Sequence, residues 1–319
     1  MIVDDRRQRA LAILDGFATA DEPLAPHTTY KLGGPASVFA TPRDIHELST
    51  VGKAVGETGL PVLVIGRGSN LLIADSGFDG IVVSLSAMGE SIEIDDVEVE
   101  AGGSAAMPVV ARRTAAAGLV GFEWAVGVPG SIGGAVRMNA GGHGSDIAAV
   151  LVSALLIDLR TGRQGWVPGE RLGLRMRGSD IADHQVVVAA RLLLAHGDPV
   201  TAEATIAEIV RWRREHQPGG QNAGSVFVNP VPGEVAAGAL IERLGLRGFS
   251  IGGAVVSEKH ANFVQATEGA TAADVRAVIE HVREVVHVAT GYLLRSEVRL
   301  AGFADNADTA DDDRPGVVI

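Results

Sequence analysis

Two glycine-rich stretches contain the residue types that could hold a nucleotide: Pro61 to Asn70 (PVLVIGRGSN) and Gly127 to Gly144 (GVPGSIGGAVRMNAGGHG). Each stretch follows an apolar run. Glycine has no Cβ, so the backbone can approach a ligand closely, and successive amides can form a concave nest for an anion. The two stretches therefore predict a cradle for the phosphates of a nucleotide cofactor. Tight turns between strands are the simpler alternative.

Several familiar motifs do not fit these stretches. After Gly66 and Gly68 the third glycine of a Rossmann fingerprint is replaced by Leu71, no helix pattern begins there, and the stretch is not a P-loop either. A serine-hydrolase elbow is excluded because Pro129 occupies the first glycine position of G-x-S-x-G around Ser131. The chain has no H-E-x-x-H motif and its histidines show no ligand spacing, so we expect no metal site.

Three further polar residues could take part in chemistry, although each has an ordinary structural explanation. Arg177 in LRMRGSD is typical of a solvated arginine at a strand end, and Ser225 in NAGSVFVNP is typical of a turn. Glu297 stands between two arginines, as a surface cross-charge of little energetic value would. Spacing alone does not join these residues into one site.

Composition and charge limit the classes of function. The chain has 319 residues, enough for two or three domains, and a formal net charge of −12. That charge and the lack of a lysine-rich run argue against nucleic-acid binding. With no cysteine, disulfides, thiolate chemistry and iron-sulfur clusters are excluded. The N-terminus lacks a signal-peptide core and no run approaches about 20 apolar residues, so we expect a cytoplasmic protein that does not cross a membrane.

Hydrophobic periodicity predicts the elements that would position these residues. A short amphipathic helix is expected over residues 1–20, and a second helical pattern runs from Ile45 to Gly59. Strands are expected at Val62–Ile65, Ile81–Leu85 and Ile92–Val99, and further apolar runs cover Leu151–Leu159 and Val186–Leu194. The first half of the chain is thus a mixture of helices and strands.

A break at residues 197–199 (Gly-Asp-Pro) predicts a domain boundary, after which another helical face begins. The last helix carries the clearest signals, because Thr271 and Asp274 form a capping box and Gly291 stands where a C-cap glycine belongs. A closing strand is expected over residues 293–300. The tail from residue 304 contains five aspartates and no periodicity, which predicts disorder.

Six long segments resemble the UDP-N-acetylenolpyruvoylglucosamine reductase family, flavoenzymes of peptidoglycan synthesis. They occur in family order and span nearly the whole chain except the N-terminal helix and the acidic tail. The segments are HTTYKLGGPA (27–36), GRGSNLLIADSGFDGIVV (66–83), GFEWAVGVPGSIGGAVRMNAGGHG (121–144), NAGSVFVNP (222–230), GALIERLGLRGFSIGGAVVSEKHANF (238–263) and EVRLAGF (297–303).

The resemblance implies an α+β fold: a two-subdomain FAD-binding unit of the vanillyl-alcohol-oxidase (PCMH) type, followed by a smaller α/β substrate domain. On this basis we expect an N-terminal helix over residues 1–20 and an FAD-binding domain over 21–197, whose subdomains divide near 85–95. A substrate-binding domain is expected over 198–303, and a disordered acidic tail over 304–319.

The resemblance also implies a two-stage reaction with FAD and NADPH. NADPH would give a hydride to non-covalently bound FAD, which would pass it to the enolpyruvyl CH2 carbon of UDP-N-acetylglucosamine enolpyruvate to give UDP-N-acetylmuramate. Hydride addition there pushes charge onto the α carbon and its carboxylate, so the site needs electrostatic stabilisation and a proton donor. By motif position Arg177 and Glu297 resemble the pair that stabilises the enolic intermediate, and Ser225 resembles the proton donor. The UDP-sugar and NADPH are the expected partners, and no obligate protein partner is inferred.

The remaining site residues follow from the same resemblance. The cofactor-binding candidates are Gly66, Arg67, Gly68, Ser69, Asn70, Gly127, Pro129, Gly130, Ser131, Gly133, Gly134, Asn139 and Gly141. The substrate-binding candidates are Arg213, Asn229, Arg247, Lys259 and His260.

The chain departs from the family pattern at three places. Met176 replaces a common tyrosine and Ser296 a common proline, and the absence of a tyrosine insertion between Arg177 and Thr201 resembles the shorter form without a tyrosine-bearing lid. Two other functions stay open: another FAD-dependent oxidase of the same fold, or a non-catalytic flavin or nucleotide-sugar binding protein. Retention of Arg177, Ser225 and Glu297 together disfavours the latter.

Overall fold

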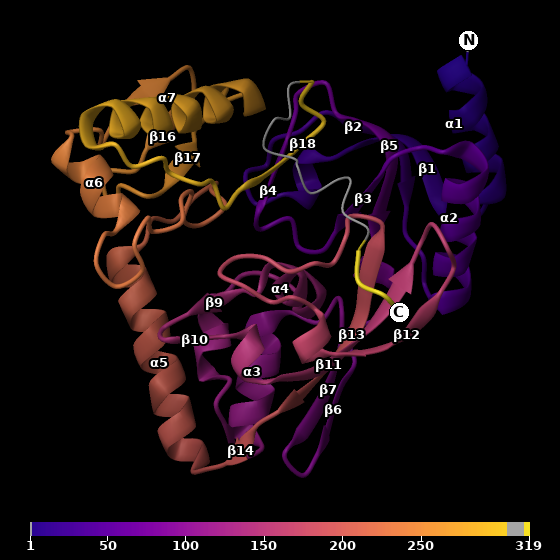
Figure 1. Ribbon diagram of the computed structural model, residues 1–319, viewed down its shortest axis with the longest axis horizontal. Coiled ribbons are helices and arrows are strands. Elements are labelled where there is room, and N and C mark those ends of the chain that lie inside the picture. Colours follow the sequence, from indigo (N-terminus) through magenta and orange to yellow (C-terminus); the bar gives the residue numbers. More distant parts are fainter. Residues whose placement is uncertain (1, 305–315) are drawn as a thin grey trace.

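The computed structural model of the chain describes residues 2–304 and 316–319. Figure 1 shows three groups of elements: an N-terminal group with α1 and α2, a central group with α3 and α4, and a C-terminal group with α6 and α7. Helix α5 runs along one side, from the central group towards the C-terminal group (Figure 1). The mixture of helices and strands agrees with the expected α+β class.

The N-terminal group packs two helices, α1 (Ile2–Ile13) and α2 (Ile45–Thr58), on a four-stranded sheet. The helix expected over residues 1–20 is shorter, because Gly16 has a φ of 89° that takes the chain out of the helix before strand β1. Helix α2 begins at Asp44, whose side chain accepts from the amide of Glu47, and ends at Gly59 with a φ of 61°. The sheet order is β1 (Ala18–Pro23), β2 (Pro35–Ala40), β5 (Phe78–Ser84), β3 (Val62–Ile65).

The central group is a five-stranded antiparallel sheet with α3 (Met107–Ala116) and α4 (Ile132–Met138). Its order is β12 (Gln164–Pro168), β11 (Leu151–Asp158), β13 (Gln185–Leu193), β7 (Glu98–Gly102), β6 (Ile92–Asp95). The single strand expected at Ile92–Val99 is wrong, because the chain reverses at Asp96, whose φ is 53°, and forms the β6–β7 hairpin. The alternating pattern continues through this two-residue turn, so periodicity alone did not reveal the reversal.

Helix α5 (Pro199–His216) follows the predicted break and begins at Asp198, which accepts from the amide of Thr201. Its buried face, Ala202, Ile206 and Ile209, belongs to the same hydrophobic cluster as α3. The domain boundary predicted at residue 197 therefore precedes a helix that packs on the central group. The chain therefore still packs on the central group along α5, and it enters the C-terminal group only after this helix ends.

The C-terminal group consists of α6 (Ala237–Arg243), α7 (Ala272–Thr290) and a sheet of β15 (Ser250–Ile251), β16 (Ala254–Val256) and β17 (Val264–Ala266). The capping box at Thr271 and Asp274 is confirmed, as is Gly291 at the C-cap with a φ of 77°. At the start of α7 the carboxylate of Asp75, from the N-terminal group, accepts from the amides of Ala272 and Ala273 at 2.8 and 3.0 Å. The first turn of α7 is thus held by two groups of elements at once.

The closing segment differs from the strand expected over residues 293–300. Strand β18 covers only Arg299–Ala301 and pairs in parallel with β4 (Leu71–Ile73), which follows the first glycine-rich stretch. Before it, the amide of Glu297 donates to the carbonyl of Val226 at 2.7 Å, and Ser296 forms an isolated bridge with Phe227. The segment therefore bonds first to residues 226–227 and then to β4, and this change of partner shortens the regular strand.

The end of the chain lies against the central group. Val317 is 7% exposed, and its amide and carbonyl both bond to the side chain of Gln185, at 2.9 and 2.7 Å. The predicted disorder over 304–319 therefore does not hold for residues 316–319, because a buried apolar side chain and a bidentate amide fix them. The aspartates of the tail fall at 305–315, outside the described residues.

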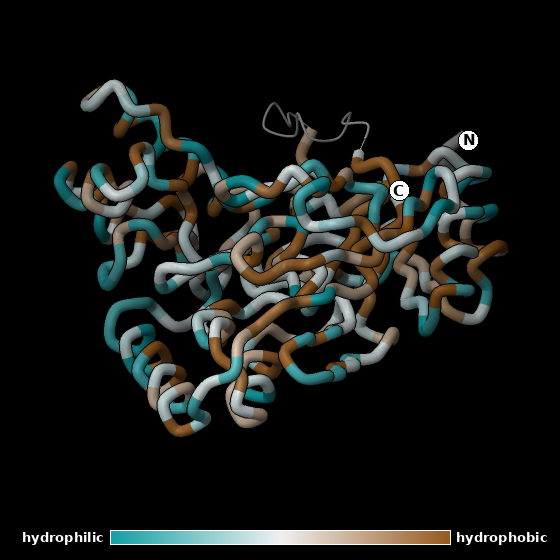
Figure 2. The backbone as a smooth tube through the Cα atoms, turned by 60° about the horizontal axis from the view of Figure 1, so that its bottom comes forward, coloured by the Kyte–Doolittle hydropathy of each residue, from teal (hydrophilic) through white to brown (hydrophobic). Residues whose placement is uncertain are grey.

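In Figure 2 many of the hydrophobic stretches of the chain, in brown, run through the middle of the molecule, while hydrophilic stretches, in teal, lie mainly at its outer turns. No helix within the described ranges has both the length and the apolar character needed to span a membrane.

Candidate functional site

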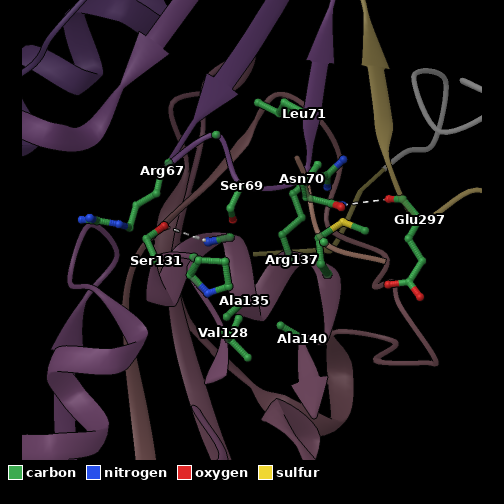
Figure 3. A pocket seen from close by; sticks show the side chains of 18 of the residues that line it. Arg67, Ser69, Asn70, Leu71, Val128, Ser131, Ala135, Arg137, Ala140 and Glu297 are labelled. Carbon is green, nitrogen blue, oxygen red and sulfur yellow. Dashed lines mark hydrogen bonds between the residues drawn. The ribbon is translucent and has the colours of Figure 1, made fainter. Parts of the chain in front are cut away.

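A cavity of about 590 Å³ lies where the three groups of elements meet. Both glycine-rich stretches line it, together with residues from α5 and from the C-terminal group. In Figure 3, Ser69 and Asn70 lie between Arg67 on one side of the pocket and Glu297 on the other. All the predicted cofactor-binding residues except Asn139 are on the wall: Gly66, Arg67, Gly68, Ser69, Asn70, Gly127, Pro129, Gly130, Ser131, Gly133, Gly134 and Gly141.

Asn139 has a structural role in place of the predicted contact with cofactor. It is 3% exposed, and its φ of 40° ends α4. Its side-chain amide donates to Asp146 and to the carbonyl of Arg175, while its oxygen accepts from the amide of Ala148. Asn139 therefore fastens the turn that carries Arg177 and does not reach the cavity wall.

The first glycine loop packs closely against the backbone of residues 27–28, while its own amides keep the capacity to donate hydrogen bonds to a ligand. Gly68 has a φ of 62°, and a Cβ there would lie 2.0 Å from the carbonyl oxygen of His27. The carbonyl of Gly68 accepts from the amide of Thr29 at 3.2 Å. Among the described residues, none accepts a hydrogen bond from the amides of residues 67–70. Such unsatisfied amides in a concave loop are suited to phosphate oxygens.

The second glycine stretch contains a short helix that the sequence reasoning missed. Ser131 caps α4, its hydroxyl accepting from the amide of Gly134 at 3.4 Å (Figure 3). The amides of Ile132 and Gly133 donate to the carbonyls of Ala105 and Gly103, so the helix is fixed to the central sheet. The serine after Gly130 was the available signal, since serine is a preferred N-cap residue.

One buried polar atom beside the cavity lacks a partner. Trp124 is 4% exposed and lines the wall, yet its Nε1–H bonds to no described group. A buried donor without an acceptor is costly, so a ligand that supplies an acceptor would be stabilised here. A glycine cradle, apolar wall residues such as Val187 and this unpaired donor fit a large heteroaromatic cofactor with a diphosphate.

Arg177 stands on a strained turn that aims its side chain at Glu297. Arg175 and Gly178 exchange backbone hydrogen bonds, and between them Arg177 has a φ of 56°, which a non-glycine residue rarely adopts. Its Nε donates to Oε2 of Glu297 at 2.8 Å and its Nη2 to the carbonyl of Gly141 at 3.0 Å. The interpretation of Arg177 as a solvated strand-end arginine is therefore wrong.

Glu297 is held from both sides and is mostly buried. Asn70 donates to its carbonyl at 2.8 Å (Figure 3), and its own amide donates to Val226. Burial raises the pKa of the Glu297 carboxyl above its usual value, and this effect outweighs the opposite influence of Arg177 and Arg295. Glu297 thus has partners that an exposed surface charge would lack.

Ser225 reaches the same wall from the C-terminal group. The next residue, Val226, accepts the bond from Glu297, so the two catalytic candidates are linked by one backbone contact. The cavity brings together Arg177, Ser225 and Glu297, which lie in three separate segments of the sequence. No local spacing pattern could have joined them.

The substrate-binding candidates separate into two sets. Arg213 lines the cavity, and burial lowers the pKa of its guanidinium. The other four are absent from the wall in this structure and bond elsewhere. Asn229 accepts from the amide of Ala237, Arg247 pairs with Glu242 at 3.0 Å, Lys259 donates to the carbonyl of Arg214, and His260 accepts from the amide of Asn262.

A charged cluster on the wall was not found from the sequence. Asp183 accepts from Arg137 and, at 2.7 and 2.9 Å, from Arg299. Arg295 donates to the carbonyl of Met176 at 3.0 Å. The alternating residues 295, 297 and 299 therefore all face the central group, and this alternation was the one visible signal.

Comparisons with known proteins place these features in a family. A model described as the C-terminal domain of UDP-N-acetylenolpyruvoylglucosamine reductase matches residues 216–301, and an FAD binding domain model matches residues 36–167. A UDP-N-acetylenolpyruvoylglucosamine reductase of Heliobacterium modesticaldum is 43% identical over 301 residues, 92% of this chain and 95% of that protein. The Bacillus subtilis enzyme of the same name is 37% identical over 90% of this chain and 95% of its own.

The fold agrees with a solved structure of the same name. The crystal structure of the reductase from Thermus caldophilus has 30% sequence identity and a TM-score of 0.76, covering 89% of this chain and 98% of that one. The resemblance noted in the sequence, the α+β fold class and the FAD-binding domain are confirmed by these matches.

Proposed function

The chain belongs to the UDP-N-acetylenolpyruvoylglucosamine reductase family of FAD-dependent oxidoreductases, and on this premise we propose that it reduces UDP-N-acetylglucosamine enolpyruvate to UDP-N-acetylmuramate with NADPH. The observation that carries the proposal is the meeting of Arg177, Ser225 and Glu297 on the wall of one cavity with the glycine cradle. A cytoplasmic location belongs to the same proposal, because NADPH and nucleotide sugars are made there.

The chain's own groups would hold the cofactor in two places. The free amides of residues 67–70 are suited to the diphosphate, and the wall around Trp124 and Val187 to the ring. When bound, FAD supplies hydride transfer between the nicotinamide and the substrate carbon. With no cysteine in the chain, cysteine cannot anchor it covalently.

Arg177 and Glu297 would stabilise charge on the substrate carboxylate as the enolic form develops. Arg177 uses Nε and Nη2 for Glu297 and Gly141, so its Nη1 hydrogens can face a carboxylate oxygen. Burial raises the pKa of Glu297, and in its protonated form this carboxyl would donate a hydrogen bond to that oxygen. Donors fixed before the reaction lower the barrier without reorganising during it.

Ser225 would supply the proton to the α carbon. A serine hydroxyl is a weak acid, but an enolate carbon is a strong enough base when the hydroxyl is aimed at it. The bond between Glu297 and Val226 fixes the position of Ser225 relative to the carboxylate-binding pair. The proton and the stabilising charges therefore reach neighbouring atoms of one substrate.

The test separates the two half-reactions of the purified FAD-loaded protein. NADPH should bleach the flavin absorbance without oxygen, and UDP-N-acetylglucosamine enolpyruvate should restore it with formation of UDP-N-acetylmuramate. Ser225→Ala should leave bleaching within a few-fold of the parent and slow reoxidation by about 10², the usual loss for a positioned general acid. Ser225→Cys, which keeps a donor, should recover part of the rate.

Each rival function predicts a different result. Another oxidase of this fold would be reduced by an alcohol or sugar and not reoxidised by the enolpyruvyl substrate. A binding protein would hold flavin without being reduced by NADPH. Normal reoxidation in Ser225→Ala would remove Ser225 from the mechanism, and equal slowing of both half-reactions would indicate a defect in folding or cofactor binding.

A further inference from the structure

Three aromatic rings meet beside the cavity, and none of them belongs to the cofactor-binding or catalytic candidates named above. The ring of Trp212, near the end of α5, stacks on His216 with centroids 4.7 Å apart and planes at 14°. His143 meets the same indole edge-on, with centroids 5.1 Å apart and planes at 87°. Trp212 and His143 both line the cavity.

Trp212 is not needed to pack α5. The helix buries Ala202, Ile206 and Ile209, whereas Trp212 is 41% exposed and lies outside every hydrophobic cluster of the described residues. His143 holds its place with a φ of 52°, between two glycines. A large exposed aromatic ring held in position on a cavity wall is suited to a planar ligand.

A cation stands directly beside these rings. A Cβ on Gly127 would lie 3.3 Å from Cδ2 of His143 and 3.4 Å from both Cδ and Nη1 of Arg213, so the bare glycine lets these two side chains converge. Burial lowers the pKa of the Arg213 guanidinium, and a partly desolvated cation gains most from an anionic partner. An aromatic face next to such a cation matches the base and phosphate of a nucleotide.

We propose that the indole of Trp212, with His143 packed perpendicular to it, is a platform that stacks the planar heterocyclic base of a nucleotide ligand on the face that His216 does not cover, with Arg213 on the phosphate. The identity of that nucleotide rests on the proposed function, which offers uracil of the UDP-sugar and nicotinamide of NADPH. Both are flat nitrogen heterocycles attached to a charged chain. The platform covers one end of the ligand in a chain without a tyrosine-bearing lid insertion.

The experiment measures ligand affinity of the FAD-loaded, oxidised protein by isothermal titration calorimetry. UDP and NADP+ are the two base-containing probes, and N-acetylglucosamine 1-phosphate is the probe without a base. Trp212→Ala should weaken binding of one base-containing probe by about tenfold or more, as expected for the loss of one stacked base. Trp212→Ala should change the affinity for the sugar phosphate by no more than about twofold, and Trp212→Phe should keep most of the affinity for the nucleotides.

The outcomes distinguish the two sources and the two hypotheses. Weakening of UDP alone assigns the platform to uracil. Weakening of NADP+ but not of adenosine 2′,5′-bisphosphate, which carries adenine without nicotinamide, assigns it to nicotinamide. Trp166→Phe is the control, because Trp166 stacks under Arg191 away from the cavity. Unchanged affinity for both nucleotides, or equal weakening of the probe without a base, would overturn the platform.

Binding of UDP or NADP+ requires no turnover. If the enolpyruvyl substrate fails to reoxidise the parent enzyme while Trp212→Ala still loses nucleotide affinity, the proposed function fails and the platform stands. If turnover is normal and nucleotide affinity does not depend on Trp212, the proposed function stands and the platform fails. His143→Ala supplies a second variant at an exposed loop residue, with the same expected selectivity for a ligand that carries a base.

Discussion

At the scale of single residues, the pKa of Glu297 connects burial to catalysis. Burial raises this pKa above its ordinary value, so between the two values the carboxyl is protonated in the folded chain and ionised in the unfolded chain. The contribution of this protonation to the stability of the fold is fully present at pH values below the ordinary pKa of a glutamate. It is lost as the pH rises through the raised pKa of the folded chain. If the neutral carboxyl is the working form, reoxidation of the flavin should slow over the same rise in pH.

Glu297→Gln tests this reasoning. The amide keeps a hydrogen-bond donor but is a weaker donor than a carboxylic acid and does not titrate, so we expect reoxidation to slow by less than the roughly 10²–10³ that complete loss of such a donor costs. The pH-dependent limb of reoxidation should flatten, with FAD content intact. Stopped-flow rates from pH 5 to 9 for both proteins give the comparison, and thermal unfolding over the same range reports stability. An unchanged kcat would return Glu297 to the role of a surface charge of under about 1 kcal/mol.

At the scale of elements, the glycines of the two loops serve different purposes. A Cβ on Gly68 would collide with the backbone of His27 and would need the φ of 62°. A Cβ on Gly130 would meet side-chain atoms at ordinary contact distances, Oγ of Ser69 at 3.4 Å and Cγ1 of Val128 at 3.9 Å, and all three residues line the cavity. Gly130→Val should therefore reduce FAD occupancy with little loss of thermal stability. Gly68→Val should reduce both, because it strains the loop itself.

The ratio of flavin to protein absorbance and the melting temperature of the flavin-free protein measure these two effects. Gly56→Val is the matched control, because a Cβ there meets nothing within 4 Å and the residue lies on the outer face of α2. Full FAD occupancy in Gly130→Val would make that loop an ordinary turn.

Sequence reasoning succeeded where the determinants are local. The residues that cap α7 and form its hydrophobic face lie within about twenty consecutive positions, and the structure has α7 where the sequence predicts it. It failed at the β6–β7 hairpin, where the same alternation fits one strand or two. The pairing of Arg177 with Glu297, 120 residues apart, depends on how distant segments meet, and only the family resemblance suggested it. The edge-on contact of His143 with Trp212 had no sequence signal, since a single aromatic residue on a helix is ordinary.

At the scale of the whole molecule, Asp75 joins the N-terminal group to the C-terminal group. Its two carboxylate oxygens accept from the first amides of α7, so Asp75→Ala should leave these donors unsatisfied and cost about 0.5–2 kcal/mol, as for the loss of a helix cap. Urea unfolding gives the free energy, and limited proteolysis shows whether the C-terminal group loosens first. Asp79→Ala is the control, since among the described residues Asp79 accepts only from Ser37, within its own group. Equal destabilisation by both changes would contradict the inter-group role of Asp75.

The pairing of β4 with β18 has a consequence for how the protein is made. Asn70 and Glu297 are 227 residues apart, and in the described chain β18 is the only strand that pairs with β4. At synthesis rates of roughly 5–20 residues per second, the ribosome needs roughly 10–45 s between the two segments. During that time the strand after the first glycine loop is an open edge, a surface that invites pairing with another chain. The edge of β4 must therefore avoid pairing with strands of other molecules until nearly the whole polypeptide has been synthesised. Only then is the cradle complete enough to take up its flavin.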